Sequence, residues 1–551
     1  MPSHIFGSSL TQTPDEGLSV TDLATGKVAH VVAVPTSHDR AKRDKATGCK
    51  DKVFNCFGYG VAFSPDGRHV YASGSGADMV YDFAVHGSTL TLAASTPVPS
   101  VVAKEPTLPV LSSTAGGPRG LAVTRDGSTL VVVSEFDSTV ETFDIGGGKA
   151  PTLRGQGLVP GGVAAAVPVA YLDAVTTSPD SATAYVSAQG LGTVFAVPLA
   201  TVPPLPPTGL PLPLPVSSVR VGDHPTGLAV SPDGSRLLVA NANRDTLSVI
   251  ALTHGLPTAP VATATVPLSV IGGRPLGTVP NSVAFAADGR RAYVALAGDD
   301  AVAVLDTTGP PAVLGYLSTA WYPTAVAVGP RDGRIYTVSA KGYGSRYTPS
   351  LGYVAAPGRT LPSGAAITSS DYYDGSNMPG VLSRVTAPEG PRLAAYTARA
   401  TLDLLHAGAL DVRPAHSPVP ATVGGVSPIS HVVYIVRENR TFDQVFGDLA
   451  LRRKDVDADP SLQILAAATP NAHALASRYA TSDRFFSSGE ASIQGHWWAS
   501  SANTSDYTEK DWWQNYSPRN RPYAPIGPAA TPPGCWPPRR PGRRPRRSCA
   551  S

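Results

Sequence analysis

TGLAVSPDGSRLLVANA, residues 226–242, has the pattern of one β-hairpin. An alternating apolar strand runs into Asp233-Gly234, and a second apolar strand leaves that dipeptide. Glycine readily adopts the positive φ that a tight hairpin turn needs, and aspartate is a favoured turn residue. The stretch therefore predicts two antiparallel strands joined at Asp233.

The same hairpin recurs along the chain, in copies that begin at Tyr59, Arg119, Leu172, Thr226, Asn281 and Thr324. Their turn residues are Asp66, Asp126, Asp180, Asp233, Asp288 and Asp332, at spacings of 60, 54, 53, 55 and 44 residues. A third strand follows each hairpin, as in DTLSVIAL and DAVAVLDT, and then a loosely patterned fourth. Four strands per repeat are typical of a propeller blade.

An incomplete copy precedes the six hairpins. GLSVTDLATGKVAHVVAVP, from Gly17, matches only the third and fourth strands of a blade, whose hairpin would lie upstream of Met1. The sequence therefore predicts an N-terminal extension over 1–16 and an all-β propeller over 17–400, most simply seven-bladed with an incomplete first blade. The repeats resemble YVTN-type propellers, a family that includes surface-layer and lactonase-like proteins.

Two segments interrupt the repeats. VPPLPPTGLPLPLP, residues 202–215, predicts a stiff polyproline spacer between blades. The Tyr-, Ser- and Gly-rich insertion 342–379 is either a surface loop or a cover for a site. After it, GVLSRVTAPEGPRLAAYT predicts the outer strands of the last blade.

Size and charge bound the organisation of the chain. With 551 residues and 42% hydrophobic composition, two or more domains are expected. The net charge is +3, but six arginines lie between Arg539 and Arg547, so the remainder carries 3 − 6 = −3. This balance argues against nucleic acid as a partner. Residues 1–17 have no signal-peptide pattern, and no apolar run approaches the ~20 residues of a membrane span.

A different pattern begins at HVVYIVRENRTFDQVFGDL, residues 431–449. HVVYIV predicts a buried strand of an α/β sheet. Thr441 and Gln444 have capping-box spacing, so a helix is expected to begin at Thr441. Its apolar stripe would consist of Phe442, Val445, Phe446 and Leu449. Glu438, Asn439 and Arg440 would then occupy a strand-to-helix turn, where α/β sheets bind ligands.

This stretch resembles the opening motif of the phosphoesterase family of phospholipase C-like and acid phosphatase-like enzymes, in the alkaline-phosphatase-like superfamily. The segment TPNAHALASRYATSDRFFSSGEASIQGHWWASSANTSDYTEKDWW, from Thr469, resembles the family's next block. The two blocks cover about residues 428–515. The resemblance implies a linker over 401–427 and a partial α/β domain over 428–525 that hydrolyses phosphoric esters with a divalent metal ion. Members of the family are often exported, but no signal peptide is visible in this chain, so its localisation stays open.

The resemblance also assigns roles to residues. It implies that Glu438 and Asn439 bind the metal, that Ser492 is the nucleophile and that His496 contacts the phosphate or the leaving group. Ser492 precedes a predicted helix, IQGHWWASSANT. From the residues alone, Glu438 and Asn439 could equally be solvated turn residues, Ser492 a helix-capping serine and His496 a packing residue.

The C-terminus departs from the family pattern, which places further Asp and His ligands downstream. No Asp, Glu or His follows Asp511, and the Pro/Arg-rich residues 526–551 read as a frameshifted tail, with a genuine basic tail as the alternative. We therefore expect this chain to have little or no phosphoesterase activity and HVVYIV to expose apolar surface. Two other functions stay open. One is a propeller that acts alone as a ligand- or protein-binding module beside an inactive remnant, and the other is lactone hydrolysis by the propeller.

Overall fold

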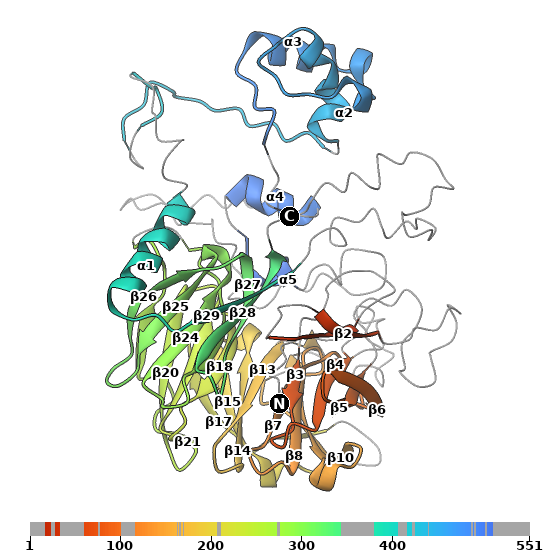
Figure 1. Cartoon of the computed structure of the whole chain (residues 1–551), viewed down its shortest axis with the longest axis vertical. Helices are drawn as coiled ribbons and strands as arrows, with labels where there is room; N and C mark the ends of the chain where they lie inside the picture. Colours follow the sequence, from red (N-terminus) through yellow and green to blue (C-terminus); the bar gives the residue numbers. More distant parts are fainter. Residues whose placement is uncertain are drawn as a thin grey trace, which may run out of the picture. The chain divides into compact units, whose positions relative to one another are not determined.

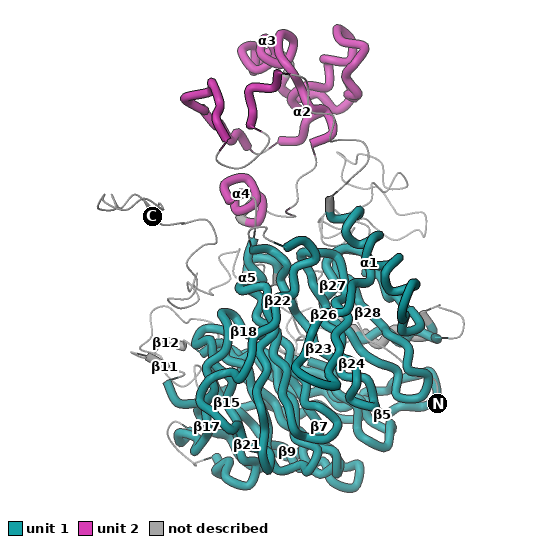
Figure 2. Tube along the Cα trace, turned by 90° about the vertical axis from the view of Figure 1, so that its left-hand side faces the viewer, with its two compact units in different colours: residues 1–407, 503–551 teal, residues 408–502 magenta. Residues whose placement is uncertain are grey.

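The computed structural model describes residues 17–23, 28–33, 60–74, 78–100, 116–161, 163–164, 167–168, 170–205, 211–272, 276–342, 380–405, 416–420, 425–438, 440–485, 489, 492–501 and 504–510. By compactness the chain divides into two units (Figure 2). Residues 1–407 and 503–551 form the propeller unit, and residues 408–502 form the helical unit.

The described residues of the propeller unit form six antiparallel blades (Figure 1). The strands of the first three blades are β3 (Val61–Phe63), β4 (His69–Gly74), β5 (Met79–His86) and β6 (Thr89–Pro97); β7 (Pro118–Val123), β8 (Thr129–Ser134), β9 (Thr139–Asp144) and β10 (Thr152–Leu158); and β13 (Leu172–Thr177), β14 (Thr183–Ala188), β15 (Thr193–Pro198) and β17 (Ser217–Arg220). The last three contain β18 (Pro225–Val230), β19 (Arg236–Asn241), β20 (Thr246–Thr253) and β22 (Ala264–Pro267); β23 (Pro280–Phe285), β24 (Arg291–Leu296), β25 (Ala301–Asp306) and β26 (Ala312–Ser318); and β27 (Trp321–Val328), β28 (Arg334–Gly342) and β29 (Val381–Thr386). Short strands at the edges are β11 (Val163–Ala164), β12 (Val167–Pro168) and β21 (Leu256–Pro257). The predicted all-β propeller is confirmed.

The hairpin turns have the predicted chemistry. Gly234 has φ 72°, and Asp233 Oδ1 accepts hydrogen bonds from Ser235 N at 3.0 Å and from Ser231 Oγ at 2.5 Å. These bonds hold the pKa of Asp233 below its usual value. In the third blade, Ser181 takes the left-handed position at φ 65°. Each turn is therefore fixed by its own side chains.

The apolar cores lie between successive blades. Val131 and Val133 of β8 cluster with Val186 and Phe195 of the next blade, and the same pairing recurs around the ring. Each fully buried aliphatic or phenyl side chain contributes about 1.5–3 kcal/mol. The faces of one blade are thus covered by its neighbours.

Glycines let the innermost strands approach each other closely. A Cβ on Gly120 of β7 would lie 2.6 Å from the carbonyl oxygen of Asp173, and one on Gly227 of β18 would lie 2.5 Å from that of Asn281. No larger residue fits at these two positions without a backbone shift. Each glycine follows the first residue of its repeat.

The incomplete N-terminal copy forms the predicted pair of strands, β1 (Gly17–Thr21) and β2 (Val28–Ala33). Leu18 and Val20 are fully buried and pack with Val70 and Phe83 of the first blade. Arg384 of β29 donates a hydrogen bond to the carbonyl oxygen of Leu23. The pair therefore lies beside the first blade and is linked to the last one.

One predicted strand of the last blade is wrong. β29 forms as expected, but α1 (Gly390–Leu405) replaces the following strand and extends into the predicted linker. The segment is rich in Ala, Leu and Arg, which are strong helix formers. Leu393 packs in the last core cluster, and Thr397 Oγ1 accepts a hydrogen bond from Tyr316 N at 2.9 Å.

The proline-rich segment lies along the second blade. Pro203 O accepts a hydrogen bond from Gln156 N at 3.0 Å, and β16 (Leu212–Pro213) pairs in parallel with β10. Leu214 is buried in the adjoining core. The described parts of the segment, 202–205 and 211–215, thus lie at the edge of the second blade. The insertion 342–379, after Gly342, lies outside the described residues.

The helical unit contains α2 (Phe442–Phe446), α3 (Pro470–Arg478) and α4 (Ser492–Ser501), and no strand among its described residues. The predicted buried strand HVVYIV is wrong. Its backbone has no β partner, and Val433 and Tyr434 are 84% and 68% exposed. The expectation that this segment exposes apolar surface is confirmed. The predicted α/β sheet is not seen, because this segment has no neighbouring strand in the described part of the unit.

The remaining short helix, α5 (Asp506–Lys510), belongs to the propeller unit. Among the described helices, none has the length and apolar character needed to cross a membrane.

Glu141 is a fully buried carboxyl group on β9. It accepts hydrogen bonds from Thr139 Oγ1 at 2.6 Å, Gln156 Nε2 at 2.9 Å and Ser134 Oγ at 3.2 Å. Burial nevertheless raises its pKa to about 7. The neutral acid is therefore the form that the blade favours.

The turn glycines can be tested by substitution. Gly234→Ala has room for its methyl group, whose nearest neighbour is 3.5 Å away, but forces alanine into the left-handed region. We expect the free energy of unfolding to fall by ~1–2 kcal/mol. Exposed Gly272, with no atom within 4 Å of its Cβ position, is the matched control. Equal denaturant midpoints for Gly234→Ala and Gly272→Ala would contradict the assignment.

Glu141 predicts a pH dependence of stability. Because its folded pKa is raised above the unfolded value, its contribution is complete below about pH 4.5 and is lost as pH rises through about 7. We expect a loss of up to about 3 kcal/mol between pH 5 and 8, which Glu141→Gln abolishes. Urea titrations across this range measure the slope. Exposed Glu389→Gln is the control, and a slope that survives Glu141→Gln would refute the prediction.

Candidate functional site

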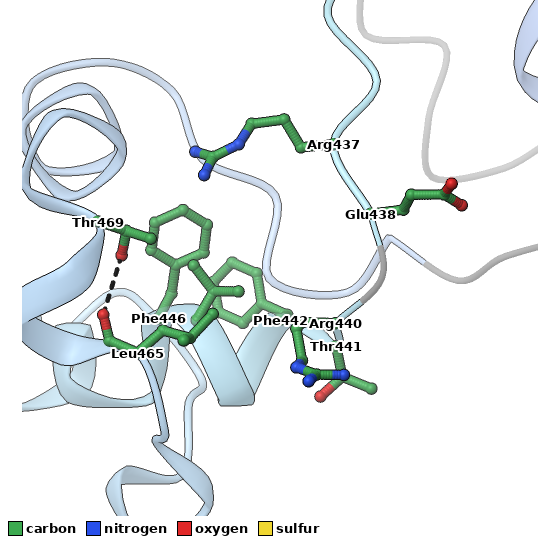
Figure 3. A pocket seen from close by; sticks show the side chains of 9 residues that line it. Arg437, Glu438, Arg440, Thr441, Phe442, Phe446, Leu465 and Thr469 are labelled. Carbon is green, nitrogen blue, oxygen red and sulfur yellow. Dashed lines mark hydrogen bonds between the residues drawn. The ribbon is translucent and has the colours of Figure 1, made fainter.

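One residue that the sequence predicts for a site, Glu438, lines a pocket of about 200 Å³ in the helical unit (Figure 3). Its lining consists of Arg437, Glu438, Arg440, Thr441, Phe442, Val445, Phe446, Leu465 and Thr469. The pocket therefore combines an apolar floor with a charged rim.

Helix α2 supplies the floor. Thr441 is its N-cap, and Thr441 N donates to Gln444 Oε1 at 3.3 Å, as the capping box predicts. The rings of Phe442 and Phe446 lie 5.4 Å apart, centroid to centroid. Leu449, the last member of the predicted stripe, is fully buried. The predicted start of the helix is confirmed, but α2 ends at Phe446 and Leu449 lies in the 3-10 helix that follows it.

The rim carries both signs of charge. Arg437 and Arg440 line the pocket on either side of Glu438 in the sequence. In Figure 3 the Glu438 carboxylate points away from the phenyl rings. Two guanidinium groups beside an apolar floor suit an anion with an organic substituent, because arginine binds phosphate and carboxylate oxygens through its fork of N–H groups.

Glu438 contacts the second predicted block. His496 Nε2 lies 3.1 Å from Glu438 Oε2, although the residues are 58 positions apart. The two side chains are 47% and 55% exposed, so the pair contributes little stability. Ser492 is the first residue of α4, one turn before His496, as predicted; its side chain and Asn439 lie outside the described residues. The structure thus brings Glu438 and His496 together.

The described side chains do not by themselves complete a metal site. Glu438 and His496 are two candidate ligands, whereas zinc takes four and calcium six to eight. Within the described ranges no three His, Cys, Asp or Glu side chains gather as a metal site would require.

A buried histidine that the sequence did not single out orders the same unit. His473 Nε2 lies 2.8 Å from Asp448 Oδ1, and its Nδ1 lies 2.9 Å from Thr469 O. The ring of Phe446 packs on that of His473 at 5.2 Å. This contact joins α3 to the pocket floor. A polar residue at a buried helical position is the signal that could have revealed it.

The propeller unit contains polar groups at one repeated position that the sequence also missed. From the second blade to the sixth, each innermost strand has a polar or charged residue at the same position of the repeat, directly before a Gly, Ala or Ser. These residues are Arg119, Asp173, Thr226, Asn281 and Thr324. Arg119 is 1% exposed and pairs with Glu135 at 3.0 Å and with Asp173 at 2.5 Å. The sequence signal that could have revealed these residues is a polar residue near the start of each of these otherwise apolar strands.

Comparison with known proteins supports the propeller. Residues 59–271 match the family described as Lactonase, 7-bladed beta-propeller. This match spans less than half of the chain and does not reach the helical unit. No curated protein matches the sequence.

Several solved structures resemble the chain at low sequence identity. A protein from Lactobacillus plantarum is 16% identical with a TM-score of 0.44, over 62% of this chain and 89% of that one. A streptogramin B lyase is 11% identical with a TM-score of 0.40, over 60% and 94%. A Bacteroides fragilis protein provisionally assigned as a 6-phosphogluconolactonase is 14% identical with a TM-score of 0.41, over 59% and 85%. At these values the likenesses carry no argument about activity.

Proposed function

We propose that residues 428–525 belong to a metal-dependent hydrolase of phosphoric esters that is carried on a β-propeller. Glu438, Asn439, Ser492 and His496 are its proposed site residues. The observation that carries the proposal is the 3.1 Å contact between Glu438 and His496, since it joins two sequence blocks that resemble one enzyme family. The arginines of the adjoining pocket supply positive charge for an anionic ester.

Each side chain has a definite task in this proposal. Ser492 Oγ attacks phosphorus, the ester P–O bond breaks, and water later cleaves the phosphoserine. Hydrogen bonding to Glu438 orients the His496 imidazole, so that it can take the serine proton and return it to the leaving oxygen. Arg437 and Arg440 bind the phosphoryl oxygens. A divalent cation belongs to the proposal, but its further ligands would come from outside the described residues, and no step is assigned to it.

The architecture of the ring is also part of the proposal. We infer that the pair β1–β2 represents a seventh blade position. The packing of Leu18 and Val20 on the first blade, the bond from Arg384 to Leu23, and the matched family's seven blades support this inference.

A second candidate function is ligand binding by the propeller itself. The polar side chains near the start of the innermost strands favour it, because they come from successive blades and three of them, Arg119, Thr226 and Asn281, are buried. Lactone hydrolysis is a further possibility for the propeller, because the name of the matched family refers to lactonases. The match over residues 59–271 is its only support.

Metal binding tests the proposed hydrolase more directly than turnover, since turnover by this chain is expected to be low. We expect equilibrium dialysis of the full chain with Mn²⁺ to show one bound ion that Glu438→Gln weakens at least tenfold and Ser492→Ala leaves in place. Any Mn²⁺-dependent hydrolysis of bis(p-nitrophenyl) phosphate should be lost in both variants.

Asp457→Asn is the matched control, because Asp457 is an exposed carboxylate of the same unit, 69% accessible and paired with Arg484. It should bind Mn²⁺ like the parent chain. Unchanged Mn²⁺ binding by Glu438→Gln, or full hydrolysis by Ser492→Ala, would remove that residue from the proposal.

A further inference from the structure

Two carboxylates of α5 are buried in the propeller unit. Asp506 is 0% and Glu509 4% exposed. Figure 2 colours α5 with the propeller unit, of which it is a compact part. Transfer of a carboxylate out of water costs several kcal/mol unless cationic or hydrogen-bonding partners compensate for it. The ring must therefore supply partners for both groups.

Those partners come from two blades. His224 Nε2 lies 3.3 Å from Asp506 Oδ2, and the Tyr322 hydroxyl lies 3.4 Å from Asp506 Oδ1. Lys341 Nζ lies 2.6 Å from Glu509 Oε2. His224 precedes β18, Tyr322 lies on β27 and Lys341 lies near the end of β28. We call His224, Tyr322 and Lys341 the ring-end cluster.

Members of the ring-end cluster also contact each other. The Lys341 ammonium lies 5.1 Å from the centre of the Tyr322 ring. Burial, and then the nearby Asp506 and Glu509 carboxylates, raise the pKa of Tyr322 well above its usual value. The phenol therefore stays protonated and able to donate a hydrogen bond. His224 itself is 2% exposed.

A repeated backbone conformation delivers two of these side chains. His224 has φ 55° and Tyr322 has φ 58°, and the equivalent loop positions Gly117, Tyr171 and Val279 also have positive φ. The N–H of Tyr322 donates to Asp300 Oδ1 at 2.8 Å, which fixes the last of these loops. The left-handed conformation costs a non-glycine residue ~1–2 kcal/mol, so tertiary contacts must hold it. In the blades of His224 and Tyr322, this conformation places the side chain against α5.

We propose that the ring-end cluster is a carboxylate-binding site in which α5 acts as a tethered ligand. His224 and Tyr322 bind one carboxylate and Lys341 binds a second. The site therefore takes molecules with two carboxylates, either acidic peptides or small dicarboxylic acids, when α5 leaves it. This site shares no residue with the proposed phosphoesterase site, and either proposal can fail alone.

The test uses the full chain with Asp506→Asn and Glu509→Gln, which removes both internal carboxylates. The probe is a fluorescein-labelled peptide of residues 503–511, followed by anisotropy. We expect the double variant to bind this peptide at least tenfold more tightly than the parent chain, whose site is already filled. Adding Lys341→Met should reverse that gain, and adding Lys341→Arg should largely preserve it because the charge is kept.

Lys149→Met in the double variant is the matched control, since Lys149 is an exposed lysine of the same unit, 55% accessible, in an ion pair with Asp144. It should leave peptide binding unchanged, and the thermal midpoint of each variant reports its folding. Displacement of the peptide by glutarate would extend the ligand class to small dicarboxylic acids, whereas failure to displace it would restrict the class to peptides. Equal peptide binding by the parent chain and the double variant, or binding that survives Lys341→Met, would overturn the proposal.

Discussion

Burial of apolar blade faces against neighbouring blades is the interaction on which the propeller depends. Residues such as Val131 and Phe195 belong to different sheets, yet they share one core. A single blade would leave such side chains in water, so the stability of each sheet comes largely from its neighbours. Strands and cores take up most of the walls of the ring, and one cluster of polar groups lies at its end. There, left-handed residues such as His224 and Tyr322 present their side chains.

The helical unit is organised differently. Its order comes from a local signal, the capping box at Thr441, and from the contact of His473 with Asp448, 25 positions apart in the sequence. No described strand covers HVVYIV, so an apolar segment that would suit a sheet is exposed to solvent. Exposed apolar surface of this kind usually has a partner. The contact between Glu438 and His496 nevertheless forms without that sheet.

The sequence predicted what depends on local chemistry. Asp233-Gly234 specified its turn, and Thr441 and Gln444 specified the start of α2, because a turn or a cap is decided by a few adjacent residues. Hydrophobic periodicity and composition could not show whether HVVYIV pairs as a strand of a sheet. Pairing depends on neighbouring strands that are distant in the sequence. The same reason explains why α1 was read as a strand and a linker. It also explains why the contact of Lys341 with Glu509, 168 residues away, was not foreseen.

Hydrogen exchange of the full chain tests most directly whether the helical unit holds the phosphate site. Exchange would be followed by mass spectrometry with Mn²⁺ alone and with Mn²⁺ and inorganic phosphate. The account predicts added protection by phosphate in peptides spanning residues 437–446 and 492–501, with unchanged exchange in the blades. Protection confined to the blades, or no protection anywhere at saturating phosphate, would contradict it.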